Sequence, residues 1–220
     1  MKLLISVIIA FIPFNKVRIF LYRGLLGFEV DYNSHIGMLN IFRCSQVKIS
    51  NARIGYLNYI NVEELILSNG SSIFKLNRLK SLNRVVLGVN SVITSKNFLG
   101  GPKKGLAFAG MSFKDQNVII GEGSSILRSN YFDVVRKIKI GNNVVFGGNG
   151  SEIWTHGFDT KRNMLVGTVE FGNNIFIGSN CVFTKSIVVC DEVSIGPLST
   201  VYKSISVAGV YSTHKLEKVK

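Results

Sequence analysis

Three histidines are the side chains of this sequence best suited to proton transfer near neutral pH, because a neutral imidazole can accept a proton there. They are His35, His156 and His214. His156 lies in the segment Trp-Thr-His-Gly-Phe-Asp, and we expect Asp159, Glu152 or a backbone carbonyl to orient its ring. The three histidines lack the grouping that a site of three imidazole ligands requires, so no metal is expected. The candidate general base is His156, because it lies in a segment that we expect to loop outward beside the long coils.

A period of six residues runs through the chain from position 169 onward and predicts how His156 is positioned. Apolar residues recur every sixth position, and also two places before each of these, with a single exception. The first set is Phe171, Ile177, Phe183, Val189, Ile195 and Val201, and the second is Val169, Ile175, Cys181, Ile187, Val193 and Ser199. This six-residue pattern of apolar positions is typical of a hexapeptide parallel β-helix, in which about 18 residues form one triangular coil. A β-sandwich would alternate with a period of two instead.

The same pattern is looser upstream, where Val-Val-Leu-Gly, Val-Ile-Ile-Gly and Ile-Lys-Ile-Gly mark the coils at 85–88, 118–121 and 138–141. We expect the solenoid to run from about residue 36 to about residue 205. Residues 100–117 and 154–168 interrupt the period and are expected to loop outward, which is where sites are built on such folds. The predicted fold class is all-β.

The amino-terminal segment combines apolar and basic residues. Residues 3–14 are mostly apolar, but the run is shorter than the roughly 20 residues of a membrane span, and 13–16 is a poor signal-peptide cleavage site. Helical spacing then relates Val17, Phe20, Leu21 and Leu25, with Lys16, Arg18 and Arg23 beside them. This pattern predicts an amphipathic helix that either lies in an anionic membrane surface or packs on the domain or a sister subunit. Both alternatives stay open.

Composition limits the classes of partner. A net charge of +13 should attract phosphates, anionic lipid or acidic glycan, whereas the motifs of a nucleic-acid-binding protein are absent. The three cysteines, Cys44, Cys181 and Cys190, fit neither a disulfide framework nor a metal site, so a reducing cytoplasm is the expected compartment. We expect a helical segment over 1–28, the β-helix over 29–206 and a basic tail over 207–220.

Three segments resemble the hexapeptide-repeat acyltransferases with a left-handed parallel β-helix, and in particular the sugar and polysaccharide O-acetyltransferases. Ile-Gly-Asn-Asn-Val-Val-Phe-Gly at 140–147 leads into 153–159, which is similar to the family's Thr-His-x-His-Asp loop. The others are 171–181 and 195–203. Phe158 stands where many relatives have a second histidine, and the segment after Lys203 is shorter than usual.

The resemblance implies a homotrimer that uses acetyl-CoA as acyl donor, with His156 deprotonating a sugar hydroxyl. It also implies that Ser179 and Pro197 line the groove for the pantetheine arm. Because they are 18 residues apart, they should stack at one corner about 4.8 Å from each other. Tyr202 and Lys203 are expected near the nucleotide end of the donor.

The resemblance further implies that Asn130, Asp133 and Trp154 contact the acceptor, while His214 and Lys215 are weaker candidates near the donor phosphates. The expected function is O-acetylation of a surface polysaccharide or its precursor, by an enzyme at the inner face of the plasma membrane. One alternative is N-acetylation of an amino sugar nucleotide. The other is a non-catalytic β-helix that scaffolds an envelope complex.

Overall fold

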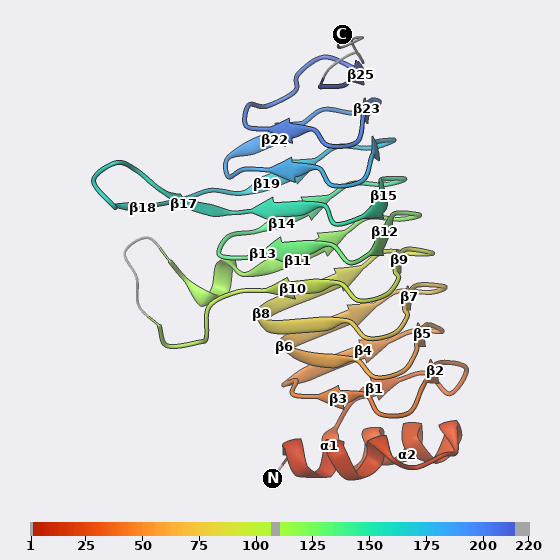
Figure 1. The fold of residues 1–220 in the computed structure, drawn as a ribbon. Helices are drawn as coiled ribbons and strands as arrows, with labels where there is room; N and C mark the ends of the chain where they lie inside the picture. Colours follow the sequence, from red (N-terminus) through yellow and green to blue (C-terminus); the bar gives the residue numbers. More distant parts are fainter. Residues whose placement is uncertain (1, 107–110, 214–220) are drawn as a thin grey trace, which may run out of the picture.

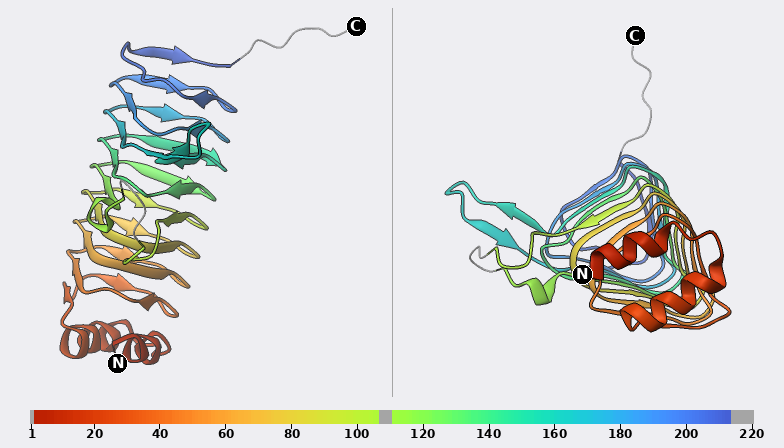
Figure 2. Two further views of the ribbon diagram at one scale, coloured as in Figure 1. Left: turned by 90° about the vertical axis from the view of Figure 1, so that its left-hand side faces the viewer. Right: turned by 90° about the horizontal axis from the view of Figure 1, so that it is seen from below.

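The computed structural model describes residues 2–106 and 111–213. They form the predicted left-handed parallel β-helix, an elongated three-sided solenoid with two helices across its amino-terminal end (Figure 1). Two segments extend from its side (Figure 2). One comprises the described residues 101–106 and 111–116, with a 3-10 turn at Phe113–Asp115, and the other is the antiparallel hairpin of β17 (His156–Phe158) and β18 (Met164–Val166). The predicted outward loops are thus confirmed.

Each face of the solenoid is a parallel sheet. Face 1 consists of β3 (Ile41–Phe42), the first halves of β6 (Tyr59–Leu67) and β8 (Arg78–Leu87), β10 (Phe98–Gly100), β13 (Tyr131–Asp133), β16 (Glu152–Trp154), β21 (Val182–Phe183) and β24 (Thr200–Val201). Face 2 consists of β1 (Glu29–Val30), β4 (Gln46–Ile49), the second halves of β6 and β8, β11 (Asn117–Ile120), β14 (Ile138–Ile140), β19 (Val169–Phe171) and β22 (Ile187–Val189).

Face 3 has nine strands among the described residues, one for each coil. They are β2 (His35–Ile36), β5 (Arg53–Ile54), β7 (Ser72–Ile73), β9 (Val92–Ile93), β12 (Ser125–Arg128), β15 (Val145–Asn149), β20 (Phe176–Ile177), β23 (Val193–Ile195) and β25 (Gly209–Tyr211). Since β25 pairs with β23, the coils extend past residue 205, into the segment expected to be tail.

The core follows from the six-residue period, because each strand turns one side of its alternation inward. On face 3 the inward row is almost fully buried. It consists of Ile36, Ile54, Ile73, Ile93, Ile126, Phe146, Ile177 and Ile195. Burial of such apolar side chains stabilises the solenoid by about 1.5–3 kcal/mol each.

A ladder of buried asparagines lines the corner between faces 3 and 1. Each Oδ1 accepts a hydrogen bond from the backbone N–H of the next member, at 2.9–3.0 Å. The members are Asn40, Asn58, Asn77, Asn97 and Asn130. The ladder satisfies backbone donors that the turn would otherwise leave unpaired in the interior.

The two helices, α1 (Lys2–Ala10) and α2 (Asn15–Leu26), cover the open end of the first coil. The sequence predicted one helical segment over 1–28, and the structure divides it into two helices, with Pro13 in the break between them. Neither described helix is both long enough and apolar enough to cross a membrane.

Arg18, one of the basic residues beside the apolar positions of this segment, is buried, and its Nε donates to the Ile36 carbonyl at 3.0 Å. Asn15 Oδ1 accepts from the Ile36 N–H at 2.9 Å, and Ser6 Oγ accepts from the Phe42 N–H at 2.9 Å. The helices therefore satisfy polar groups of the first strands, which an uncovered edge would expose.

Candidate functional site

His156 is the centre of the candidate site. It begins the extended hairpin, directly after β16, and its Nδ1 lies 2.6 Å from Oδ2 of Asp133 on the neighbouring strand β13. An ionised carboxylate only accepts hydrogen bonds, so this contact places the ring proton on Nδ1 and leaves the Nε2 lone pair free. Nε2 makes no hydrogen bond to residues that the structure describes. The imidazole thus has the tautomer and the exposure that a general base needs.

Burial governs the charge of Asp133. Its side chain is 11% exposed, and burial raises the pKa of its carboxyl, while the hydrogen bond from His156 acts in the opposite direction. A carboxylate held in such surroundings interacts with a protonated imidazole more strongly than one in water does. Asp133 is therefore placed to stabilise the imidazolium that forms when His156 accepts a proton.

Thr155 fixes the relative position of these two residues. Its buried hydroxyl donates to the Asp133 carbonyl at 2.8 Å and accepts from the backbone N–H groups of Val135 and Arg136 at 2.7 and 3.0 Å. Its carbonyl accepts from Gly167 N–H at 2.9 Å, where the chain returns from the hairpin. The threonine next to His156 thus joins the strand that carries Asp133 to the base of the hairpin.

The predicted orienting carboxylates are engaged elsewhere. Glu152 Oε2 accepts from Trp154 Nε1 at 2.8 Å. Asp159 accepts from the backbone N–H groups of Lys161 and Asn163 at 2.8 Å, within the hairpin turn. The prediction that one of them, or a backbone carbonyl, orients His156 is wrong. Asp133 does so because β13 lies directly beside β16.

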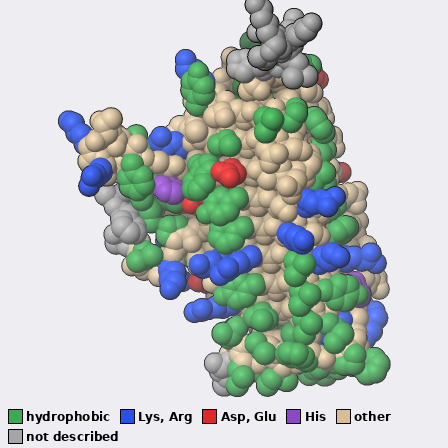
Figure 3. All heavy atoms as spheres, in the orientation of Figure 1, with side chains coloured by type: hydrophobic (Ala, Val, Ile, Leu, Met, Phe, Trp, Pro, Cys, Tyr) green, Lys and Arg blue, Asp and Glu red, His purple; other side chains and the backbone are tan. Residues whose placement is uncertain are grey.

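A row of aromatic rings runs along face 1 toward His156. Phe98 stacks on Tyr131 with ring centroids 4.9 Å apart, and Tyr131 lies 5.2 Å from Trp154. Trp154 contacts His156 edge-on at 6.2 Å. Phe98, Tyr131, Asp133 and His156 share a pocket of about 170 Å³ with residues of both extended segments. Figure 3 shows hydrophobic side chains gathered on this face of the molecule.

The three predicted acceptor residues lie in different surroundings. Asn130 is 1% exposed and belongs to the buried ladder, where its Oδ1 accepts from Ser151 N–H at 3.0 Å. The Asn130 side chain cannot contact an acceptor sugar without breaking these hydrogen bonds, so the prediction of a sugar contact is not supported. Trp154 is half-buried beside His156, and Asp133 lines the pocket.

The predicted donor corner lies away from His156 within one chain. Ser179 and Pro197 share a corner, as the pairing of Ile177 with Ile195 requires, and Leu198 N–H donates to the Ser179 carbonyl at 2.9 Å. This corner joins face 3 to face 1, whereas His156 follows the opposite edge of face 1. The two are separated by a whole strand, on the order of 10 Å.

The remaining candidates lie near the carboxyl end. Tyr202 and Lys203 are exposed, with the lysine Nζ 5.7 Å from the tyrosine ring centroid. His214 and Lys215 lie outside the described residues. Within the described ranges, no three histidine, cysteine or acidic side chains come together as metal ligands would.

Comparison with known proteins adds a likeness of fold. No protein-family model and no curated protein matches the chain. Among 26 matching solved chains is the hexapeptide-repeat acetyltransferase VCA0836 from Vibrio cholerae, with a TM-score of 0.46 and 15% identity over 61% of this chain and 70% of that chain. VCA0836 has also been solved with acetyl coenzyme A, and that structure scores 0.42 at 14% identity, covering 61% of this chain and 67% of that chain.

Two further structures are named after the compounds on which those proteins act. A maltose O-acetyltransferase from Clostridium difficile scores 0.35 at 24% identity, covering 66% of this chain and 65% of that chain. The polySia-specific acetyltransferase NeuO scores 0.37 at 16% identity, covering 88% and 86%. All are acetyltransferases, the class that the sequence resembles. Identities and scores this low do not establish a family, so function is argued from the site.

Proposed function

We propose that this protein transfers an acetyl group from acetyl-CoA to a sugar hydroxyl of a surface polysaccharide or its precursor. The observation that carries the proposal is the 2.6 Å contact of His156 Nδ1 with Asp133, which leaves Nε2 available beside the pocket. An imidazole held in this way by a carboxylate is the arrangement that activates hydroxyl groups in acyl transfer.

The proposed reaction needs only proton transfer and one exchange at the carbonyl carbon. Nε2 of His156 accepts the proton of the sugar hydroxyl as its oxygen attacks the thioester carbonyl. The C–S bond then breaks, and the imidazolium returns the proton to the departing sulfur, which leaves as coenzyme A. Asp133 stabilises the imidazolium between these steps. The rings of Tyr131 and Trp154 offer surfaces against which a sugar can lie.

The separation of the predicted donor corner from His156 favours a site shared between chains. In the proposed homotrimer, His156 of one chain faces the corner of Ser179 and Pro197 on the next. Tyr202 and Lys203 of that chain would lie toward the nucleotide, where an ammonium can meet a phosphate. A cyclic trimer presents three equivalent grooves of this kind.

The helical cap supports a further proposal, that the protein binds the surface of an anionic membrane. Eight large apolar side chains of the cap are exposed, and hydrophobic side chains cover the bottom of the molecule in Figure 3. The eight are Leu3, Leu4, Ile8, Phe11, Phe14, Val17, Phe20 and Leu25. A bilayer is the proposed occupant because the protein carries a net charge of +13, which attracts anionic lipid.

The test of function measures coenzyme A release from acetyl-CoA in the presence of candidate glycans, with the acetylated product identified by mass spectrometry. His156→Ala should lose about 10²–10⁴-fold in kcat/KM. His35→Ala, on face 3, is the matched control and should keep wild-type activity. Equal activity in His156→Ala and wild type would contradict the assignment of the base. No acetyl transfer to any glycan by the wild type would favour the scaffold instead.

A further inference from the structure

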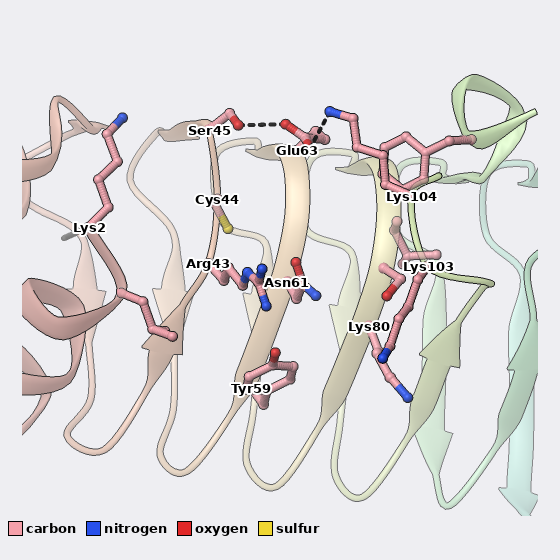
Figure 4. A pocket seen from close by; sticks show the side chains of 14 residues that line it. Lys2, Arg43, Cys44, Ser45, Tyr59, Asn61, Glu63, Lys80, Lys103 and Lys104 are labelled. Atoms are coloured by element: carbon pink, nitrogen blue, oxygen red, sulfur yellow. Dashed lines mark hydrogen bonds and ion pairs between the residues drawn. The ribbon is translucent and has the colours of Figure 1, made fainter. Parts of the chain in front are cut away.

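A second cavity, of about 640 Å³, lies on face 1 between the helical cap and the described residues 101–106 and 111–116 of the extended segment, and we call it the basic groove. Five cationic side chains line it, from four different parts of the chain. They are Lys2, Arg43, Lys80, Lys103 and Lys104. Figure 4 shows Lys103 descending from the extended segment toward Lys80, with Arg43 beside Asn61 on the sheet. Figure 3 shows several basic side chains on this face of the molecule, above the hydrophobic bottom.

Only one carboxylate lines the groove, and it is already engaged. Glu63 accepts from Ser45 Oγ at 2.5 Å and from Lys104 Nζ at 3.0 Å, and these hydrogen bonds hold the pKa of its carboxyl below the ordinary value. Within the described residues, the other four cations have no carboxylate within ion-pair distance. The groove therefore carries an uncompensated positive charge in a concave surface, which attracts anions.

The strand register connects this groove to the candidate site. On face 1, Arg43 follows β3 opposite Asn61, and the paired positions in the next coils are Lys80, Gly100 and Asp133. All occupy outward positions of one row along the solenoid axis. Neighbouring strands are about 4.8 Å apart, so Lys80 lies about 10 Å and Arg43 about 19 Å from Asp133.

The two cavities adjoin along this row, and the ring of Phe98 lies against Gly100 between them. Gly100, between Lys80 and Asp133, has no side chain, and Lys80 lines both the basic groove and the pocket of His156. A molecule lying along the row could therefore place a hydroxyl at His156 and an anionic group between Lys80 and Arg43. An oligosaccharide can span that distance.

We propose that the basic groove binds an anionic group of the acceptor, a phosphate or a carboxylate, two to four coils away from Asp133. This inference rests on the proposed function, because it takes the acceptor to be a glycan that reacts at His156. Ammonium and guanidinium groups bind such oxyanions through charge-assisted hydrogen bonds, and Asn61 and Tyr59 add neutral donors. The acceptor would then be an acidic glycan or a glycan carried on a phosphate.

The experiment measures binding calorimetrically, without acetyl-CoA, using inorganic pyrophosphate, trigalacturonate and neutral maltotriose as probes. Wild type should bind at least one anionic probe more tightly than maltotriose, and the better of the two identifies the source of the negative charge. Arg43→Gln/Lys80→Gln should weaken that binding at least about tenfold. Lys139→Gln removes an exposed cation from face 2 and should have no effect.

Several results would overturn the inference. One is that maltotriose binds as tightly as both anions. Another is that Lys139→Gln weakens anion binding as much as the double variant does. A third is that the double variant loses coenzyme A binding to the same extent, which would assign the groove to the donor. Lys103→Gln lies outside the coils and repeats the test without altering a strand; it should weaken binding in the same direction. If the protein transferred no acetyl group but still bound anions in a way that depends on Lys80, the proposed function would be contradicted. The inference that the groove binds anions would stand.

Discussion

At the scale of single residues, the sequence could predict His156 but not its partner. The histidine lies in a recognisable Trp-Thr-His segment, whereas Asp133 precedes it by 23 positions and was expected to contact the acceptor. The coil brings the two together because Asp133 pairs with Trp154, after which the chain turns outward. Such proximity depends on the register between coils. That register includes a shift between β12 and β15, which the local sequence does not reveal.

Asp133→Asn tests whether this carboxylate positions and stabilises the imidazole. The amide keeps the size of the side chain but removes the charge and can hold the wrong tautomer of His156. We expect kcat to fall about 10²–10⁴-fold with KM for acetyl-CoA nearly unchanged. Steady-state kinetics measure both constants. Asp159→Asn, in the exposed hairpin turn, serves as control, and an equal loss there would contradict a specific role for Asp133.

Asp133→Asn should lower activity but raise the stability of the folded protein. Burial raises the pKa of Asp133 in the folded protein above the reference value of 3.8, so the folded state holds the proton more tightly than the unfolded state. The associated stabilisation is complete below pH 3.8 and is lost as the pH rises through the folded pKa. The melting temperature of Asp133→Asn should therefore increase relative to wild type from about pH 4 upward. Calorimetry measures both melting temperatures. A difference between the variant and wild type that stayed constant with pH would contradict the prediction.

At the scale of structural elements, the six-residue period was sufficient to predict the faces and their inward rows. It was not sufficient for the corners. The resemblance implies that Asn130 contacts the acceptor, yet it continues a ladder that begins four coils earlier at Asn40. The ladder members are 18 to 33 residues apart, because the extended segment intervenes before Asn130. Unequal spacing of this kind conceals a structural repeat in a single sequence.

Asn97→Ala measures what the ladder contributes. It removes the acceptor of the Asn130 N–H and Nδ2 hydrogen bonds, at 2.9 and 3.1 Å, and leaves buried donors unpaired. We expect the free energy of unfolding to fall by about 2–3 kcal/mol. Urea denaturation at matched protein concentration provides the measurement. Asn69→Ala, at an exposed turn, should change it by less than about 0.5 kcal/mol, and similar losses in both variants would show that burial of the amide is unimportant.

At the scale of the whole molecule, the cap gives the solenoid two unlike ends. One side of the helices covers the first coil through Arg18, Asn15 and Ser6, while the other side exposes apolar residues. The sequence predicted apolar and basic character here, but it could not show which residues face inward. Arg18 has the same local pattern as Arg23, but its buried guanidinium donates to the Ile36 carbonyl of the first coil and to the Ile12 carbonyl.

Membrane binding by the cap is tested by co-sedimentation with vesicles of phosphatidylglycerol and phosphatidylcholine. Phe11→Ser/Phe20→Ser should weaken binding more than tenfold, since burying each phenylalanine contributes about 1.5–3 kcal/mol. Phe74→Ser, an exposed phenylalanine of the coils, is the control. Vesicles of phosphatidylcholine alone should bind less of the wild type. Equal binding of the double variant and the control would exclude the cap as the contact.

A site shared between subunits can be tested by mixing two inactive variants. The first variant, His156→Ala, lacks the base but keeps an intact donor corner. The second, Ser179→Trp, keeps the base, and its new side chain fills its own donor corner. When subunits of the two variants exchange at random in a trimer, an interface joins an intact histidine to an intact corner about one time in four. We therefore expect coenzyme A release to recover to about one quarter of the wild-type rate, although each variant alone is inactive. If base and corner acted within one chain, every chain in the mixture would lack one of them. Mixed trimers, verified by native mass spectrometry, would then remain inactive.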